Sequence, residues 1–386
     1  MIIKQNLHTF HIPVMGTGYT IDTPLYVAPY GISSVISIID HRLIEQMREF
    51  HCIENNIPYT VIDDSDSDSR ANQITAYLNL LYDLIEKRFL TIKNQSFEDN
   101  NELTKYFEML PDSSELKKDY LKMKQNNDFS NAQHLKDSMS IGSIDVNIMT
   151  KLDRDNFSKS NEKLDVEFND AHAALRGYAK SKLYSSLILS AGLNPRLFAY
   201  LSSFDCFYPN EDGFIEKKIV LKVSDYRSAL VQGKMLAKKG IWVSEFRIES
   251  GLNCGGHAFA TDGFLLGPIM EEFKKNRNDL EKDLYDILSI ALKGKNINLS
   301  KAPEMKITVQ GGVGTFQEHC LLMEYYNVDS VGWGSPFLLV PEVVNINEET
   351  MNLIANADES QFYMSNVSPL GVLFNTVKGT SGEIEK

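Results

Sequence analysis

The chain has 386 residues with a formal net charge of −13 at pH 7, and 43% of its residues are hydrophobic. That length allows one large domain or two ordinary ones, with enough apolar residues for a sizeable core. A chain this acidic has no basic face for a phosphate backbone, so we expect no nucleic-acid partner.

The first sixty residues alternate between apolar, β-branched runs and helical patterns. Strands are predicted over 10–15, 31–39 and 57–62, and Asp40 is a good N-cap for the helix that follows the second of them. This alternation is typical of a parallel sheet. It stops at a polar stretch with helical spacing, which we interpret as a helical insertion because structureless loops of that length are uncommon.

Strand and helix patterns alternate again from residue 183. The fourth to eighth strands are predicted over 185–192, 217–224, 241–249, 305–315 and 329–340. Eight such units predict an α/β protein, a (β/α)8 TIM barrel with a large helical insertion after the third strand.

The most informative stretch is IESGLNCGGHAFATDG, residues 248–263, directly after the sixth predicted strand. Gly255 and Gly256 let the backbone approach a ligand closely, and His257 follows them as a titratable side chain. Such a turn can seat a cofactor beside a base. A tight turn with a structurally hydrogen-bonded histidine is the alternative.

Two more glycine turns follow the last two predicted strands. Gly311 and Gly312 come after the seventh strand, and Gly332, Gly334 and Ser335 come at the eighth. Barrels often hold a phosphate between these two loops, on backbone N–H groups and a helix N-terminus. Two ordinary left-handed turns would produce the same pattern.

Lys222 lies near the end of the fifth predicted strand, where barrels place their chemistry. Its apolar neighbours on both sides, Leu221 and Val223, favour a position inside the barrel over a surface lysine at a strand end.

Two patterns suggest metal binding, but neither has the arrangement of residues that the metal requires. Cys254 and His257 could join His319 and Cys320 in a zinc set, but adjacent side chains on a helix diverge by about 100°. The run DDSDSDS has a serine where a calcium loop needs glycine. We therefore predict no metal site.

FHIPVMGTGYTIDTP, LNCGGH, ITVQGGVGT and SVGWGSPFL together resemble the nitronate monooxygenase group, formerly called 2-nitropropane dioxygenases. These are FMN-dependent TIM barrels related to flavin-dependent enoyl-acyl carrier protein reductases. The chain departs from the family pattern at Asn253-Cys254, at Gln310 and in its large insertion, and these departures leave the substrate open.

The resemblance implies roles for individual residues. His257 would be the base that removes the substrate α-proton, and Lys222 would stabilise negative charge on the reduced flavin. The residues implied in FMN binding are Met15, Gly16, Thr17, Lys222, Gly255, Gly256, Gly311, Gly312, Gly332, Gly334 and Ser335.

On this basis the chain divides into four parts. They are 1–63, the first part of the FMN-binding barrel; 64–182, a mainly helical insertion; 183–345, the remainder of the barrel with its catalytic and phosphate-binding loops; and 346–386, a C-terminal covering segment. The four scattered cysteines fit no disulfide framework, the N-terminus has no apolar signal-peptide core, and no apolar run is long enough for a membrane span. We therefore expect a cytoplasmic protein without a membrane partner.

The predicted function is that of a flavoprotein oxidoreductase, similar to nitronate monooxygenase, acting on a small substrate with an acidic C–H bond. Two alternatives stay open: a flavin-dependent enoyl-thioester reductase using NAD(P)H, and a non-catalytic barrel that binds FMN or a phosphorylated metabolite. The oligomeric state is also open, a homo-oligomer being one option.

Overall fold

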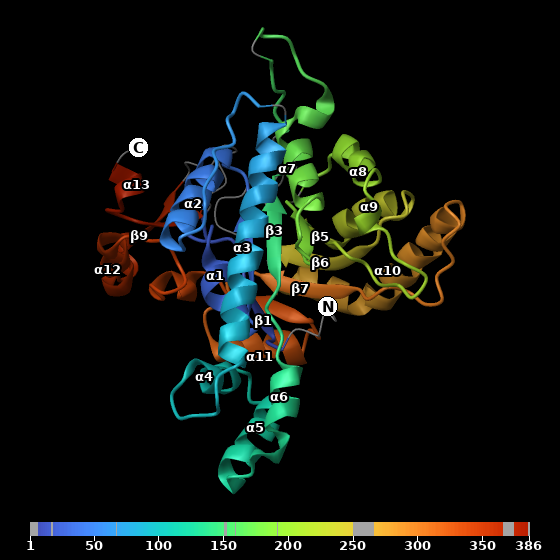
Figure 1. Cartoon of the computed structure of the whole chain (residues 1–386). Coiled ribbons are helices and arrows are strands. Elements are labelled where there is room, and N and C mark those ends of the chain that lie inside the picture. The colour runs from blue at the N-terminus through green and yellow to red at the C-terminus, as the bar shows by residue number, and fades with distance from the viewer. Residues whose placement is uncertain are drawn as a thin grey trace.

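The computed structural model describes residues 7–16, 18–66, 68–149, 153–158, 160–190, 192–249, 266–365 and 374–384. Within these residues eight parallel strands pair in chain order and close into a barrel, with the last strand pairing to the first (Figure 1). The strands are β1 (Phe10–Ile12), β2 (Ser33–Ser37), β3 (Ile144–Ile148), β4 (Ser186–Leu189), β5 (Lys218–Val223), β6 (Val243–Glu249), β7 (Lys306–Gln310) and β8 (Ser330–Gly332). The predicted α/β barrel is confirmed.

Helices pack around the barrel and bury one face of each strand. They are α1 (Thr23–Val27), α2 (His41–Glu54), α3 (Ser69–Lys93), α7 (Asp170–Ala179), α8 (Pro195–Leu201), α9 (Tyr226–Ala237), α10 (Leu266–Lys293) and α11 (Phe316–Glu324). On β5, Ile219 and Leu221 point into the core under these helices, whereas Val220 and Lys222 point into the barrel. Asp40 caps α2 as predicted, since its carboxylate accepts from two N–H groups of the first turn.

The third strand is not where the sequence pattern placed it. The segment 57–62 is irregular, and side chains satisfy its carbonyls: Arg48 donates to Thr60 and Gln73 to Ile62. The true β3 is IDVNI, which lies inside the predicted insertion. Asp145 and Asn147 face the barrel interior, so this strand lacks the apolar run that identified the others.

The helical insertion therefore follows β2, not the third strand, and 64–182 is not a single insertion. Helix α3 packs between α2 and α7 as part of the barrel wall. The segment between α3 and β3 projects from the barrel as an arm of three short helices: α4 (Glu102–Glu108), α5 (Glu115–Asn126) and α6 (Ala132–Ser138).

The arm lies at the end of the barrel where the strands begin, whereas an insertion directly after a strand, as the sequence predicted, would lie at the end where the strands stop. Its small core, built around Phe107 and Tyr120, also takes in Leu7, Tyr30 and Ile141. These last three residues precede β1, β2 and β3 respectively. In Figure 1 the arm forms the lower tip of the molecule, while β3 points upward.

The inside of the barrel is unusually polar. Its apolar cluster among the described residues is small, consisting of Val35, Ile188 and Val220, with Val14 against them. TIM barrels usually fill this space with layers of branched apolar side chains. Here charged groups such as Lys222, Arg247 and Glu249 share it.

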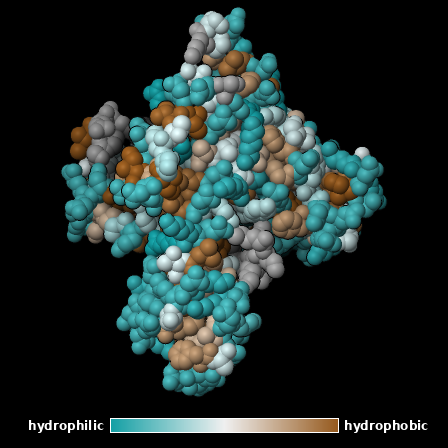
Figure 2. Space-filling view, in the orientation of Figure 1, coloured by the Kyte–Doolittle hydropathy of each residue, from teal (hydrophilic) through white to brown (hydrophobic). Residues whose placement is uncertain are grey.

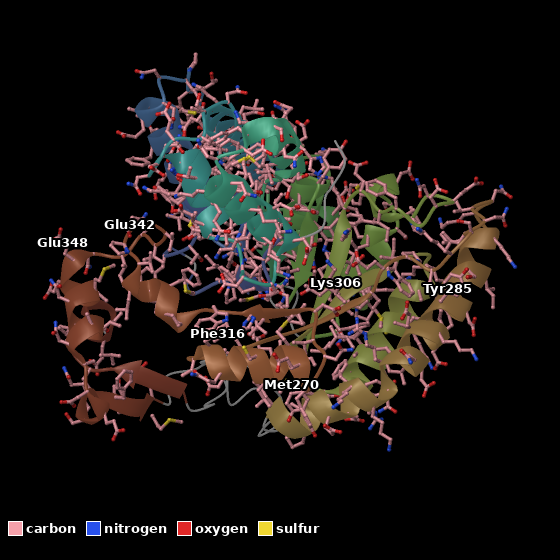
Figure 3. The ribbon with its side chains drawn as sticks, turned by 90° about the horizontal axis from the view of Figure 1, so that it is seen from below. Met270, Tyr285, Lys306, Phe316, Glu342 and Glu348 are labelled. Atoms are coloured by element: carbon pink, nitrogen blue, oxygen red, sulfur yellow. The ribbon has the colours of Figure 1, made fainter. Side chains whose placement is uncertain are left out.

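The C-terminal part continues past β8 through a short helical turn, η5 (Ser335–Leu339), to the side of the barrel near α1 and α2. It comprises α12 (Glu348–Asn356), the antiparallel pair β9 (Phe362–Ser365) and β10 (Phe374–Val377), and α13 (Ser381–Ile384). In Figure 3 the stretch with Glu342 and Glu348 lies opposite α10, which carries Tyr285. Thr23 anchors its start by donating to the carbonyl of Val343.

Hydrophilic residues dominate the face of the molecule seen in Figure 2, including most of the arm. None of the helices in the described residues is long and apolar enough to cross a membrane.

Candidate active site in the mouth of the barrel

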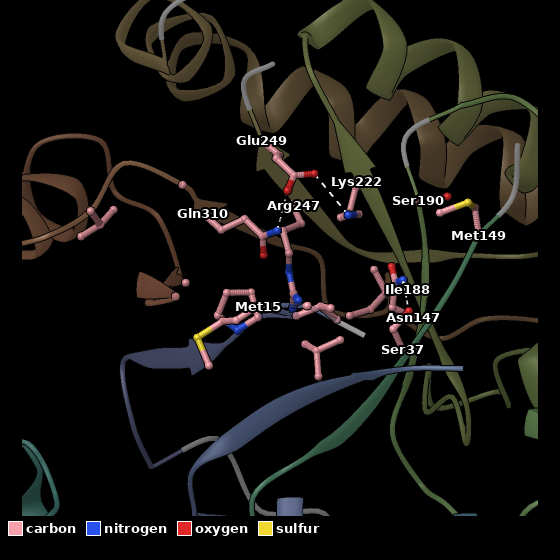
Figure 4. Close-up of a pocket in the computed structure, with 18 of the residues that line it drawn as sticks. Met15, Ser37, Asn147, Met149, Ile188, Ser190, Lys222, Arg247, Glu249 and Gln310 are labelled. Carbon is pink, nitrogen blue, oxygen red and sulfur yellow. Dashed lines mark hydrogen bonds and ion pairs between the residues drawn. The ribbon is translucent and has the colours of Figure 1, made fainter. Parts of the chain in front are cut away.

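A cavity of about 500 Å³ opens where the strands end, and we call it the mouth cavity (Figure 4). Its volume lies within the range of small-molecule sites. Its wall combines bare backbone with polar side chains. The glycines that line it are Gly16, Gly311, Gly312, Gly332 and Gly334. The polar side chains are Ser37, Asn147, Ser190, Lys222, Arg247, Glu249 and Gln310.

Lys222 and Glu249 form a buried ion pair at this mouth. The Lys222 ammonium lies 3.3 Å from Glu249 Oε2, and both side chains are less than 10% exposed. Gln310 donates from its Nε2 to the other carboxylate oxygen at 2.9 Å. Lys222 is thus inside the barrel, as its apolar flanks predicted, but its charge is compensated by a neighbour that the sequence did not reveal.

Arg247 extends along the barrel axis below this pair. It lines the mouth cavity and also a second cavity of about 420 Å³ at the opposite end, the floor cavity. Its guanidinium lies 2.7 Å from Glu245 and 3.9 Å from Asp145. Burial raises the pKa of Asp145. For Glu245 burial is the largest single effect and acts to raise the pKa, but Arg247, His11 and Thr308 together outweigh it and lower the pKa.

The opposite wall of the mouth cavity carries a neutral polar pair. Asn147 on β3 donates to the Ser37 hydroxyl on β2 at 3.1 Å, and both side chains are buried. Their free hydrogen-bonding capacity faces the cavity, because both residues line it. This pair can orient a polar heterocycle without adding charge.

The glycines that were predicted to bind a phosphate differ in their backbone conformation and in the space around them. Gly311 and Gly312 have φ of 95° and 74°, a region that favours glycine, and their turn presents backbone to the cavity. A Cβ on Gly334 would meet nothing closer than 3.6 Å. A Cβ on Gly332 would lie 2.6 Å from Gln310 Cβ, so packing inside the barrel already requires glycine there.

The start of α11 is less open to a phosphate than its sequence suggested. The Glu318 carboxylate accepts from the N–H groups of Gly314 and Thr315, both at 2.9 Å, in a capping box. The bond from Gly314, followed by those from Thr315, lowers the pKa of Glu318. Phosphate binding here would depend on the preceding turn, Gly311 to Val313, whose N–H groups meet no acceptor in the described part of the chain.

Some predicted site residues can be placed and others cannot. Met15 and Gly16 line the mouth cavity, and their role in FMN binding stays a prediction. Ser335 begins η5 directly after the eighth strand. Thr17, Gly255, Gly256 and His257 lie outside the described residues, so their roles remain predictions.

Sequence reasoning missed Arg247, Glu249, Asn147 and Ser37 as lining residues. A signal for two of them was present, since β6 reads Glu245, Phe246, Arg247, Ile248, Glu249 and alternates strictly between charged and apolar residues. That period of two marks a strand with one polar face, and inside a barrel this face is the interior.

A further cavity of about 720 Å³ adjoins the mouth between the ends of β2 and β3 and the start of α7. It shares Ile39 and Met149 with the mouth cavity. Arg70 borders it, held by the carbonyl of Ile39 at 3.0 Å and by His41 at 3.0 Å. The mouth therefore has room beyond its central cavity for a second molecule or a longer ligand.

A scan against protein-family models finds no match, and a search of curated proteins finds no similar sequence. Among solved structures, the chain is similar to the enoyl reductase domain of MlnA from the macrolactin biosynthesis cluster of Bacillus amyloliquefaciens, with 14% sequence identity and a TM-score of 0.40. The match covers 68% of this chain and 57% of that one, so the chain spans less than two thirds of its length. Similarity at this level does not bear on activity, and the functional conclusion has to come from the site.

Proposed function

We propose that the mouth cavity binds FMN and that the chain is a flavin-dependent oxidoreductase. The observation that supports this most is the composition of one cavity wall. It combines a left-handed glycine turn, whose N–H groups meet no acceptor among the described residues, with a buried lysine at the end of a strand. The first suits a phosphate and the second suits a ring that gains negative charge.

The residues present fit the cofactor in two ways. The turn at Gly311 and Gly312 and the open space at Gly334 leave room for a phosphate group against backbone. Asn147 and Ser37 offer neutral hydrogen-bonding groups for the polar edge of an isoalloxazine. When bound, FMN would supply the hydride or electron transfer that no side chain can perform.

Lys222 would bind the edge of the ring where negative charge develops, and Glu249 would hold the ammonium in place. A cation in a buried site acts more strongly than one in water, because the surroundings screen it less. The paired carboxylate keeps the lysine oriented before the cofactor arrives. His257, which lies outside the described residues, would remove a proton from the substrate carbon.

We further propose a small substrate with an acidic C–H bond, as in the nitronate monooxygenase group. The space beside Ile39 and Met149 would admit that substrate next to the ring. Only groups at the mouth are needed for such chemistry: one base for the proton and one cation for the developing charge.

The visible absorption spectrum of the freshly purified chain tests the cofactor. We expect flavin bands, and FMN as the nucleotide released on heating. A nucleotide-free protein that also fails to bind added FMN would refute the proposal.

Turnover assays then separate the possible reactions. Oxygen uptake with a nitronate is the expected result. NAD(P)H consumption with an enoyl thioester would move the chain to the reductases, and neither activity would leave a barrel that binds FMN without turnover. His257→Asn should keep the flavin and reduce its rate of reduction by a carbon acid about 10² to 10⁴-fold, the usual contribution of a general base.

A further inference from the structure

His11 on β1 lies deeper in the barrel than the mouth cavity and does not line it. The side chain is only 3% exposed. Its Nε2 lies 3.4 Å from Gln310 Oε1, and its Nδ1 lies 3.3 Å from the Ser330 hydroxyl. It therefore contacts β7 and β8 at once, from the strand that closes the barrel.

The chemistry of the neighbours determines which nitrogen of His11 carries the proton. Gln310 donates from its amide nitrogen to Glu249, so its amide oxygen must face His11. An amide oxygen only accepts, so His11 Nε2 must be the donor. Nδ1 is then bare in the neutral ring and accepts from Ser330.

The surroundings also keep the ring neutral. Burial lowers the pKa of His11 to about 3, and the positive charge of Arg247 adds to this, against a smaller opposing effect of Glu245 and Gln310. The neutral Nε2–H donor of His11 and the Glu249 carboxylate therefore hold the two ends of the Gln310 amide, its oxygen and its nitrogen, in one orientation.

Gly332 on the neighbouring strand makes this contact possible. A Cβ at that position would lie 2.6 Å from Gln310 Cβ and 2.9 Å from His11 Nε2. The glycine is therefore required by the His11–Gln310 contact itself, which makes the contact a built feature of the barrel.

We propose that His11 is a positioning residue for the mouth, which orients Gln310, through it Glu249, and through Glu249 the ammonium of Lys222. The four side chains form one buried chain from β1 through β7 and β6 to β5. Figure 4 shows its upper part, with Gln310 and Lys222 on either side of Glu249. The effect of His11 on flavin chemistry rests on the proposed function, whereas its effect on Gln310 does not.

Without the Nε2 donor, the Gln310 amide oxygen loses its partner and only the bond to Glu249 still holds the amide, so the amide can turn over. Its oxygen would then face the Glu249 carboxylate, and two acceptors would repel each other. Glu249 would relieve the repulsion by taking up a proton or by moving, and either change frees Lys222. A substitution at a residue that touches neither flavin nor substrate would then alter the pH dependence of the site.

Nitrogen-15 NMR of the histidine rings in the full chain tests the first step without any cofactor. We expect His11 as the Nε2–H tautomer, with no titration between pH 8 and 5. His319 provides an internal reference of the same tautomer, because its Nδ1 accepts from Trp333 at 3.1 Å and its Nε2 faces Thr9. An Nδ1–H tautomer at His11, or titration near pH 6.5, would overturn the proposal.

Gly332→Ala and Gly334→Ala form a matched pair for the same measurement. The first pushes on the His11–Gln310 contact, and the second adds the same methyl where nothing lies closer than 3.6 Å. We expect the His11 ring signals to move only in the first. Equal responses in both variants would contradict the inferred contact.

The reaction itself tests the second step. His11→Leu should add an acidic limb to the pH profile of flavin reduction, and His11→Gln, which can donate to Gln310, should restore the wild-type profile. Identical profiles in all three proteins would remove the positioning role. If the chain binds no FMN, this second step cannot operate and the proposed function fails, while the NMR result still decides the arrangement of His11.

Discussion

The two ends of this barrel are both hollow and both polar, yet they are built differently. The floor cavity is lined by residues that include Asp145, Glu245 and Lys218, and none of the described residues that line it is a glycine. Five glycines line the mouth cavity. Because glycine has no side chain to cover its backbone N–H group, the mouth is better suited than the floor to bind an anion through its main chain.

The charged residues that line the two cavities also make the mouth better suited to an anion than the floor. Among the described residues, five carboxylates and three cations line the floor cavity, whereas two cations and one carboxylate line the mouth cavity. Arg247 belongs to both and is neutralised from the floor side by Glu245. A phosphorylated cofactor should therefore prefer the mouth on electrostatic grounds alone, and the following experiments test that difference.

The largest effect is expected from Gly312→Val, which should abolish FMN binding. The added side chain would stand where the phosphate contacts backbone, at a φ of 74° that L-residues rarely adopt. Gly379→Val is the matched control, because that glycine has a φ of 83°, an open environment and no place in the lining of the mouth cavity. Both variants should lose about 1–3 kcal/mol of stability to backbone strain. Titration with FMN followed by fluorescence distinguishes the two variants. Retained FMN binding in the Gly312 variant would show that the phosphate does not contact this turn.

Lysines at the two ends of β5 offer a second comparison. Lys222→Met should destabilise the fold by about 3–5 kcal/mol, because it leaves the buried Glu249 without its partner. Lys218→Met, at the floor end of the same strand, should have little effect, since no carboxylate of the described residues pairs with Lys218 and burial already lowers its pKa. Urea unfolding of both variants measures the difference. The double substitution Lys222→Met with Glu249→Leu should recover much of the lost stability. Similar losses of stability from both lysine substitutions would show that the ion pair with Glu249 does not make Lys222 more important for stability than Lys218.

Lowering the pH should destabilise the folded protein through the buried His11. The folded pKa of His11, about 3, lies below the ordinary value of 6.5, so protonation favours the unfolded chain. Stability should be fully present above about pH 6.5 and should fall as the pH drops toward 3, by at most about 1.4 kcal/mol per pH unit from this group. His11→Gln should show a shallower decline in denaturant unfolding measured from pH 7 to 4. Parallel curves would mean that His11 ionises freely in the folded protein.

The smallest effect is expected at the start of α11, where Glu318→Gln removes a negative charge next to the proposed phosphate. The amide oxygen can still accept from Gly314 and Thr315, so the cap should survive. FMN affinity should rise by roughly two- to fivefold at low salt, and the gain should shrink as salt screens the charge. An unchanged affinity at low salt would place the phosphate away from this helix.

The sequence predicted the strands well where their residues alternate or are continuously apolar, and poorly where the inward face of a strand is polar. LYSSLILSAG and KKIVLKVS contain β4 and β5 because their outward residues are consistently apolar. IDVNI was not recognised as a strand, because its inward residues are polar. Asp145 and Asn147 find their partners, Arg247 and Ser37, on strands far away in sequence. IPYTVI has β-branched residues but no neighbour to pair with, and local propensity cannot reveal that.

The candidate site shows the same limit. Glycine turns and Lys222 were recognisable because each has a local signature. Glu249 and Gln310 acquire their roles only from the contacts they make across the barrel, 3.3 Å and 2.9 Å from partners on other strands. No window of sequence contains both members of those pairs.

The closure of the barrel has a consequence for how the protein is made. His11 and Ser330 are 319 positions apart, and β1 meets β8 only when both exist. At about 5–20 residues per second, a ribosome needs on the order of tens of seconds to add β8 after β1. During that time the nascent chain carries an unpaired strand edge and an unsatisfied polar interior. Closure of the barrel therefore waits until β8 has been translated, so chaperone demand should depend on how quickly the stretch between β1 and β8 is translated.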